Sequence, residues 1–211
     1  DSLSNLGSLT TSSTDAITVS VNDALGATRA ATDLSTLGGK TSGTVTVSNA
    51  INITGDTAGA TAALVTSGTK VVASSATVSL SDNPSITALN NIASVAGVVT
   101  ATLAAADTTD LLNLTTTSTD AITVSVNDTP SITNLNTIAG KTAGVVTATL
   151  AADSLSNLGS LTTSSTDVIT VSVNDALGAT TAATDLSTLG GKTAGTVTVS
   201  NAINITGDTA G

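Results

Sequence analysis

Ile17-Thr18-Val19-Ser20-Val21 alternates apolar and hydroxyl-bearing residues with a period of two. In a β-strand successive side chains point to opposite faces, so one face of this segment is apolar and the other carries hydroxyls. The segment is therefore typical of a strand that is buried on one side. Seven more segments have this character, at residues 44–48, 77–80, 98–103, 122–126, 145–150, 169–173 and 196–200.

The predicted strands recur along the chain at similar intervals. Their central residues, from Val19 and Val47 to Val171 and Val199, are 23 to 31 residues apart. A repeat of roughly 20 to 50 residues indicates a solenoid, in which each unit buries its apolar face against its neighbours. We expect one continuous array over residues 1–211, with units at about 1–23, 24–55, 56–82, 83–106, 107–128, 129–152, 153–175 and 176–207.

A longer duplication contains the short repeat. Residues 1–59 recur at 153–211, and the two copies differ only at Ala16/Val168, Arg29/Thr181 and Ser42/Ala194. The long period is thus 152 residues and holds six short units. Because Gly211 matches Gly59 in the middle of the pattern, we expect the array to continue beyond it.

Apolar triplets at i, i+3 and i+6 precede most of the predicted strands and fit one stripe of a short helix. They are Leu3/Leu6/Leu9, Ile86/Leu89/Ile92, Ile132/Leu135/Ile138 and Leu155/Leu158/Leu161. Asn83-Pro84 and Thr129-Pro130 each place a capping residue before a proline at a predicted helix start. Gly38-Gly39, Gly140 and Gly190-Gly191 fall where the helices should end.

Together these signals predict a repeat solenoid with one strand per unit of about 25 residues. Strands that are joined by crossovers lie parallel, so the strands should form a parallel β-sheet with short helices or turns on the other side. The Thr/Ser-rich segment at 115–119 forms helix poorly, which keeps an all-β solenoid or β-helix open as the alternative.

The composition argues against most kinds of chemistry. The chain has no Cys, His, Met, Phe, Tyr or Trp, and all 15 acidic residues are Asp. General acid–base catalysis usually needs His or a tuned Glu, Lys, Tyr or Cys, so we expect no enzyme, no catalytic residue and no cofactor. A net charge of −10 repels nucleic acid, and no apolar run reaches the roughly 20 residues that span a bilayer.

The stretch Ala31-Thr-Asp-Leu-Ser-Thr-Leu-Gly-Gly-Lys-Thr-Ser-Gly-Thr-Val-Thr-Val-Ser-Asn49, which recurs at 183–201, resembles repeats of giant extracellular and cell-surface proteins of cyanobacteria and other aquatic bacteria. The resemblance implies an adhesin, sheath, surface-layer or surface-fibre role and a bacterial extracellular location. It brings no active-site residues. We expect a structural protein that forms a rod or fibre by stacking its repeats and by associating with itself.

Aspartates follow the predicted strands and could align when the repeats stack. Two facing carboxylates with turn carbonyls can hold calcium, which takes six to eight oxygens. The other interpretation is that these residues satisfy backbone donors at turns and helix caps. The candidate calcium ladder, which would make the chain a calcium-stiffened adhesin module, consists of Asp23, Asp56, Asp82, Asp128, Asp175 and Asp208.

The outward face of the strands should carry a ladder of hydroxyls. Regular Thr-x-Thr arrays resemble the water-ordering face of ice-binding solenoids, although Thr also simply suits a half-exposed strand. A regular uncharged face could instead pack against another rod, and this use is preferred over ice binding. The face is expected at Thr18, Thr46, Thr77, Thr102, Thr123, Thr149, Thr170 and Thr198.

Lys40, Lys141 and Lys192 share a Gly-Lys-Thr triplet after a predicted helix. The triplet matches the end of a phosphate-binding loop, but the earlier glycine of that motif is missing, with Asp33 and Leu34 in its region. A lysine near a helix C-terminus stabilises the helix dipole. We therefore expect each lysine to serve its own helix.

Overall fold

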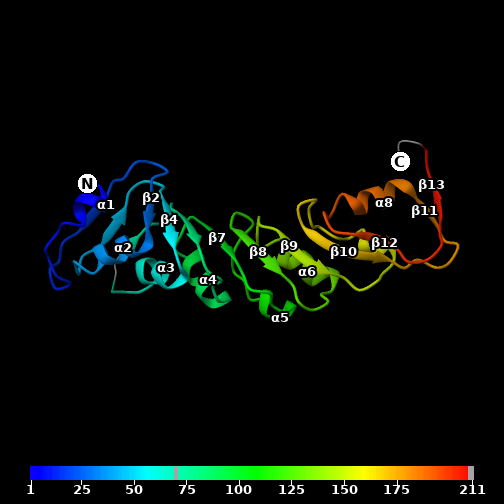
Figure 1. Cartoon of the computed structure of the whole chain (residues 1–211), viewed down its shortest axis with the longest axis horizontal. Helices are drawn as coiled ribbons and strands as arrows, with labels where there is room; N and C mark the ends of the chain where they lie inside the picture. The colour runs from blue at the N-terminus through cyan, green and yellow to red at the C-terminus, as the bar shows by residue number, and fades with distance from the viewer. Residues whose placement is uncertain (69–70, 209–211) are drawn as a thin grey trace. The chain divides into compact units, whose positions relative to one another are not determined.

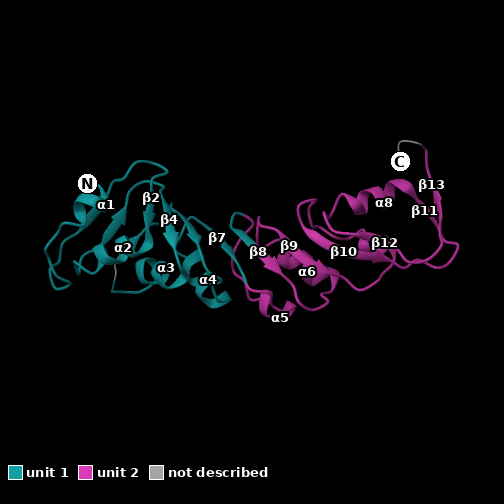
Figure 2. Ribbon diagram, in the orientation of Figure 1, with its two compact units in different colours: residues 1–103, 119–122 teal, residues 104–118, 123–211 magenta. Residues whose placement is uncertain are grey.

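The computed structural model describes residues 1–68 and 71–208, and its contacts divide the chain into two compact units (Figures 1 and 2). Unit 1 holds residues 1–103 and 119–122, and unit 2 holds residues 104–118 and 123–211. Residues 69–70, which belong to the predicted repeat 56–82, lie outside the described part. The continuous array over 1–211 stays a prediction.

Unit 1 alternates short helices with short strands. Its elements are α1 (Leu3–Leu6), β1 (Val19–Val21), β2 (Thr28–Ala30), α2 (Ala31–Gly38), β3 (Val45–Val47), β4 (Asn52–Gly55), α3 (Thr57–Leu64), β5 (Val71–Val72), β6 (Thr77–Leu80), α4 (Ile86–Ala93) and β7 (Val98–Thr102).

Unit 2 has the same alternation. Its elements are α5 (Thr108–Leu111), most of β8 (Ala121–Ser125), α6 (Ile132–Ala139), β9 (Val146–Thr149), α7 (Leu155–Leu158), β10 (Val168–Val173), β11 (Thr180–Ala182), α8 (Ala183–Gly190), β12 (Val197–Val199) and β13 (Asn204–Thr206).

The strands within each unit pair in parallel. In unit 1 the rows are β1–β3–β5 and β2–β4–β6–β7, and in unit 2 they are β8–β9–β10–β12 and β11–β13. Paired residues lie about one predicted repeat apart, as in the pairing of Val19 with Val45. Since each connection between paired strands carries a helix, the predicted parallel α/β fold with short helices is confirmed.

The expected single strand per repeat is wrong for the longer repeats. All eight predicted strands exist, but β2, β4, β5, β11 and β13 were not predicted and lie in the stretches 24–55, 56–82 and 176–207. One strand per repeat would make the consecutive predicted strands 44–48 and 77–80 neighbours, yet β3 pairs with β5 and β6 pairs with β4. The spacings of 28 to 31 residues leave room for a second strand, which the spacings of 23 and 24 do not.

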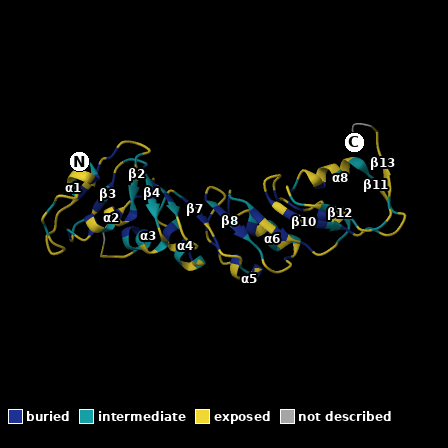
Figure 3. Cartoon of the chain, viewed as in Figure 1, coloured by how far each residue is buried: buried dark blue, intermediate teal, exposed yellow. Residues whose placement is uncertain are grey.

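The core is built from aliphatic residues of the strands and helices. Figure 3 colours the buried residues dark blue along these elements. The burial of β10 alternates as its period-two sequence predicts, with Ile169, Val171 and Val173 buried. In the eight-residue helices α4 and α6, the predicted stripe buries Leu89, Ile92, Leu135 and Ile138. Neighbouring helices within a unit contact each other, as α2 and α3 do in unit 1 and α7 and α8 do in unit 2.

Most helix boundaries follow the expected signals, with two corrections. The C-caps of α2, α6 and α8 are Gly39, Gly140 and Gly191, as predicted. The predicted starts at Pro84 and Pro130 are wrong by two residues, because Ser85 and Ser131 are the N-caps and accept hydrogen bonds from the third residue beyond each of them.

The triplets Leu3/Leu6/Leu9 and Leu155/Leu158/Leu161 form only one helical turn each, because α1 and α7 end before the third leucine. In the described residues, no helix has the length and apolar character of a membrane span.

Candidate functional site: contacts between repeats

The Gly-Lys-Thr triplets lie at the C-terminal ends of α2, α6 and α8, and each lysine reaches into the preceding repeat. Lys40 Nζ donates hydrogen bonds to the carbonyl oxygens of Gly7 (2.8 Å) and Leu9 (2.5 Å), just after α1. Lys141 contacts Leu112 and Leu114 after α5 at 2.8 and 2.5 Å, and Lys192 contacts Leu161 after α7 at 2.5 Å. The expectation that each lysine serves its own helix is therefore corrected: the ammonium binds free carbonyls that follow the neighbouring helix.

A threonine of the preceding repeat binds the backbone of each lysine in turn. The hydroxyl groups of Thr11, Thr116 and Thr163 donate to the carbonyl oxygens of Lys40, Lys141 and Lys192, each at 2.8 Å. Each lysine thus binds its neighbour through its side chain and through its own carbonyl group. We call this pair of contacts the lysine clamp.

The threonine of the triplet is buried and binds the backbone of the preceding repeat. Thr41 Oγ1 accepts hydrogen bonds from the amides of Ile17 and Gly43, both at 2.9 Å. Thr193 Oγ1 does the same with Ile169 and Gly195, both at 2.7 Å. These threonines occupy the point where a strand of one repeat begins beside the next repeat.

A glycine two residues after each of these threonines allows the close approach. A Cβ atom at Gly43 would lie 2.2 Å from the carbonyl oxygen of Ile17, and one at Gly195 would lie 2.4 Å from that of Ile169. Backbones can approach this closely only without a side chain. The functional motif is therefore Gly-Lys-Thr-x-Gly, two residues longer than the triplet seen in the sequence.

Two buried aspartates join repeats at the strand starts. Asp120 Oδ1 accepts from the amide of Val99 and Asp167 Oδ1 accepts from that of Val146, each at 2.8 Å. Both residues are 5% exposed. Asp167 Oδ2 also accepts from the amide and the hydroxyl of Ser164, so its carboxylate orders its own turn and the preceding repeat at once.

The candidate calcium residues sit mostly at helix N-termini. Four of them, Asp23, Asp82, Asp128 and Asp175, accept hydrogen bonds from the first amides of α1, α3, α5 and α7. Asp56 is the N-cap of α3, and Asp208 follows β13. Across the described residues no three carboxylates gather into a metal-binding group. Calcium binding stays a prediction, and the caps are the contacts that the structure shows.

The hydrogen bonds at two of these caps change the titration of the carboxylates. The Arg29 guanidinium donates to Asp23 and holds the pKa of this buried carboxyl below its ordinary value. The same contact raises the pKa of Arg29. At Asp82 the hydroxyl of Thr57 lowers the pKa of the carboxyl. Each cap is therefore held in its charged form by its neighbour.

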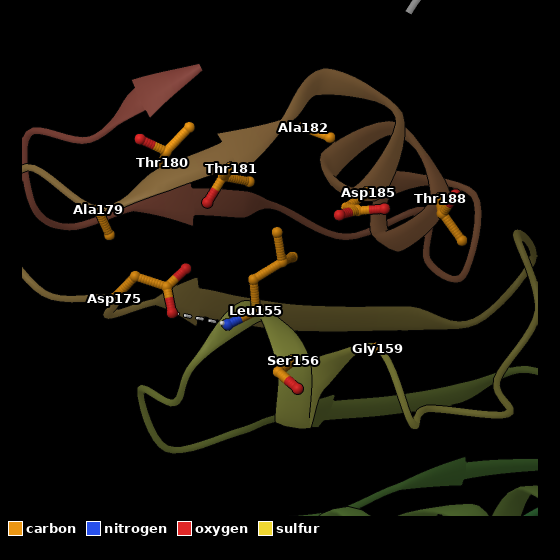
Figure 4. A pocket seen from close by; sticks show the side chains of 10 residues that line it. All are labelled: Leu155, Ser156, Gly159, Asp175, Ala179, Thr180, Thr181, Ala182, Asp185 and Thr188. Atoms are coloured by element: carbon orange, nitrogen blue, oxygen red, sulfur yellow. Dashed lines mark hydrogen bonds between the residues drawn. The ribbon is translucent and has the colours of Figure 1, made fainter. Parts of the chain in front are cut away.

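The second copy lacks the arginine, because Thr181 replaces Arg29 there. Asp175 still caps α7 through the amide of Leu155 at 3.3 Å, but it is half-buried (Figure 4). It lines a groove of about 450 Å³ together with Thr181, Asp185 and Thr188. The equivalent groove in the first copy is lined by Arg29, Asp33 and Thr36 and holds about 440 Å³.

None of the eight residues of the predicted hydroxyl face is buried. They do not, however, follow one another in a single row. Thr149 lies opposite Thr170, but Thr46 lies between Ser20 and the half-exposed Val72, and Thr77 lies between Asn52 and Val98. Apolar and amide side chains therefore stand beside hydroxyls in these rows.

Comparison with protein families, curated proteins and solved structures gives no match for this chain.

Proposed function

We propose that this chain is an extracellular structural repeat protein whose repeats stack as a solenoid into a rod or fibre, with other copies of itself as its partners. A surface filament, a sheath or an adhesin stalk would be its setting. The observation that carries the proposal is the recurrence of one set of contacts between consecutive repeats. The lysine clamp, the buried threonine and the close-approach glycine join neighbours in both copies of the duplicated sequence.

The distribution of polar groups supports this role. Buried polar side chains, among them Thr41, Thr193 and Asp167, are bonded to backbone groups of an adjacent repeat. A buried polar group costs free energy unless it is hydrogen-bonded, so each such group favours one alignment of the two repeats. This pattern specifies how repeats stack and leaves small aliphatic residues to fill the core.

The alternatives use the same residues differently. An ice-binding face needs a regular row of hydroxyls, and Val72 and Asn52 interrupt the rows here. A calcium-stiffened module needs carboxylates that are free to gather, whereas those of Asp23, Asp82, Asp128 and Asp175 cap helices. We therefore favour the structural role over both of them.

Electron cryo-microscopy of the purified chain, with and without a calcium chelator, tests the proposal. Strands stacked along a rod give an axial spacing of about 4.8 Å. Rods with this spacing that persist in chelator are the expected result. Compact particles without the spacing would contradict the solenoid, and rods that melt on chelation would favour the calcium-stiffened module.

A further inference from the structure

The two copies of the duplicated sequence differ in a single charged residue. Of the three positions that distinguish them, only Arg29/Thr181 changes a charge. In the first copy the Arg29 guanidinium donates to Asp23 Oδ1 at 2.5 Å. This hydrogen bond raises the pKa of Arg29, and the nearby charge of Asp33 raises it further. The guanidinium therefore lies close to two carboxylates.

The second copy keeps both carboxylates and lacks the cation. The equivalents of Asp23 and Asp33 are Asp175 and Asp185. Asp175 Oδ1 accepts a hydrogen bond from the amide of Leu155 at 3.3 Å, and the described part of the chain supplies no second hydrogen bond to this carboxylate. Asp175 is half-buried, whereas Asp23 under its guanidinium is 3% exposed. The second copy thus opens a carboxylate that the first copy covers.

Both carboxylates of the second copy line one groove of about 450 Å³ within unit 2 (Figure 4). Asp185 extends from α8, and Asp175 lies beside the start of α7. Neither flanking repeat closes the groove. The first-copy groove stays open with the following repeat 56–82 in place, and the second-copy groove stays open with the preceding repeat 129–152 in place. The opening therefore belongs to the pair of repeats that forms it.

The chemistry of the groove matches a guanidinium group. Two carboxylates without a cation between them repel each other, so a bound cation lowers the free energy of the site. A guanidinium is planar and carries five N–H donors, which lets it bond to two carboxylates at once, whereas an ammonium is a point charge. The hydroxyl groups of Thr181 and Thr188 also line the groove and can accept further N–H groups.

The cations in the described part of the chain are already bound. Arg29 pairs with Asp23, and the lysine clamps hold Lys40, Lys141 and Lys192. A guanidinium that enters the second-copy groove therefore comes from a different polypeptide.

We infer that the groove lined by Asp175, Thr181 and Asp185 binds an arginine side chain of another protein. The incoming guanidinium takes the place that Arg29 fills in the first copy, and Thr181 leaves the room for it. The inference does not depend on the proposed fibre, because the groove lies within one pair of repeats. It adds a partner of a different kind to the self-association proposed above.

Nuclear magnetic resonance titration of the ¹⁵N-labelled chain with the blocked tripeptide Gly-Arg-Gly tests the site. The amide of Leu155, bonded to Asp175, is the reporter, and the equivalent amide of Leu3, bonded to Asp23, is the internal control. The Leu155 resonance should shift to saturation while that of Leu3 stays in place. The blocked peptide Gly-Lys-Gly should bind at least about threefold more weakly, because its ammonium does not span both carboxylates.

Exchanging the differing residue between the copies should move the site. Thr181→Arg supplies the cation within the chain and should abolish the saturable shift at Leu155. Arg29→Thr should create a second site that the amide of Leu3 reports, so the number of bound peptides rises from one to two. Circular dichroism checks that both variants keep the fold.

A pair of charge-matched variants separates the groove from the general acidity of the chain. Asp185→Asn should weaken binding of the arginine peptide at least about threefold, because one of the two carboxylates loses its charge. Asp110→Asn removes the same charge from an exposed residue that does not line the groove, and it should leave the affinity unchanged.

No saturable shift at Leu155, equal binding of the two peptides, or equal effects of Asp185→Asn and Asp110→Asn would overturn the arginine site. Saturation by methylguanidinium but not by the arginine peptide would also overturn it, because the groove would then admit only a small ion. Saturation of the same amides by calcium chloride at lower concentration than by the peptide would assign the groove to a metal ion instead. Rods with the axial spacing under any of these results would leave the proposed function standing.

Discussion

The hydroxyl oxygen of Thr193 lies 2.7 Å from the amide nitrogen of Ile169 and 2.8 Å from the carbonyl oxygen of the same residue. Ile169 belongs to the preceding repeat, so one side chain satisfies two backbone groups of its neighbour. Thr41 binds Ile17 in the same way in the first copy, at 2.9 and 2.6 Å. This contact is short, buried and repeated, and it sets the alignment of adjacent repeats.

Replacing Thr193 by Val tests this contact at nearly constant volume. The amides of Ile169 and Gly195 lose their acceptor in a buried place, which should lower the free energy of unfolding by about 2 to 3 kcal/mol. Thr193→Ser keeps the hydroxyl and should cost less than about 1 kcal/mol. Urea denaturation followed by circular dichroism measures both variants, and equal losses would show that the hydroxyl contributes nothing.

Gly43→Ala should be among the most destabilising small substitutions in the chain. Its Cβ would lie 2.2 Å from the carbonyl oxygen of Ile17, so two backbone segments must separate. We expect a loss of about 3 kcal/mol or more in the free energy of unfolding. Gly68→Ala is the control, because a Cβ there meets no atom within 4 Å. Similar thermal midpoints for the two variants would refute the close approach.

Lys141→Met removes the ammonium and keeps most of the apolar stem. The carbonyl oxygens of Leu112 and Leu114 lose a charged donor, and a half-buried site limits the cost to about 1 to 2 kcal/mol. Hydrogen exchange should quicken at the amides around α5 and change little around α3. Faster exchange that is uniform over the chain would mean that the lysine does not act locally.

The pair of Asp23 and Arg29 makes stability depend on pH with a definite sign. Because the pKa of Asp23 is lowered in the folded chain, its stabilisation is present above the unfolded pKa of about 3.9 and is lost as the pH falls through the folded value. Arg29→Thr reproduces the second copy and should cost about 1 kcal/mol at neutral pH, since Arg29 is one-third exposed.

Urea midpoints measured between about pH 7 and pH 2.5 test this dependence. The difference between the original chain and Arg29→Thr should shrink below about pH 4. A constant difference across the series would assign the effect to lost packing instead of charge.

The strands could be predicted from the sequence because apolar and polar residues alternate with a period of two even in short segments. All eight predicted strands occur, since aliphatic residues alternate with hydroxyl residues in each of them. The missed strands are two to four residues long, and β2 and β11 carry too few apolar residues to show a period. Ile51-Asn52-Ile53-Thr54 does alternate, so the sequence carried a signal for β4 that the expectation of one strand per repeat left out.

The partners of the site residues could not be read from the sequence. The Gly-Lys-Thr triplet is visible three times, but nothing within it shows that Lys40 binds carbonyls more than 30 residues earlier. Asp23 and Asp175 look identical in local sequence and differ through Arg29 and Thr181 six residues away. Such contacts depend on which distant residues the fold brings together, and they appear only in three dimensions.

β10 is shared between two neighbours, with residues 168–170 paired to β9 and residues 171–173 paired to β12. During synthesis the chain emerges from its N-terminus, so β9 is available when β10 leaves the ribosome and β12 is not. Synthesis adds roughly 5 to 20 residues per second, so β12 is complete about one to five seconds after the second half of β10. The first half of β10 can therefore pair as soon as it is synthesised, whereas its second half pairs only after β12, which orders the folding of this strand in time.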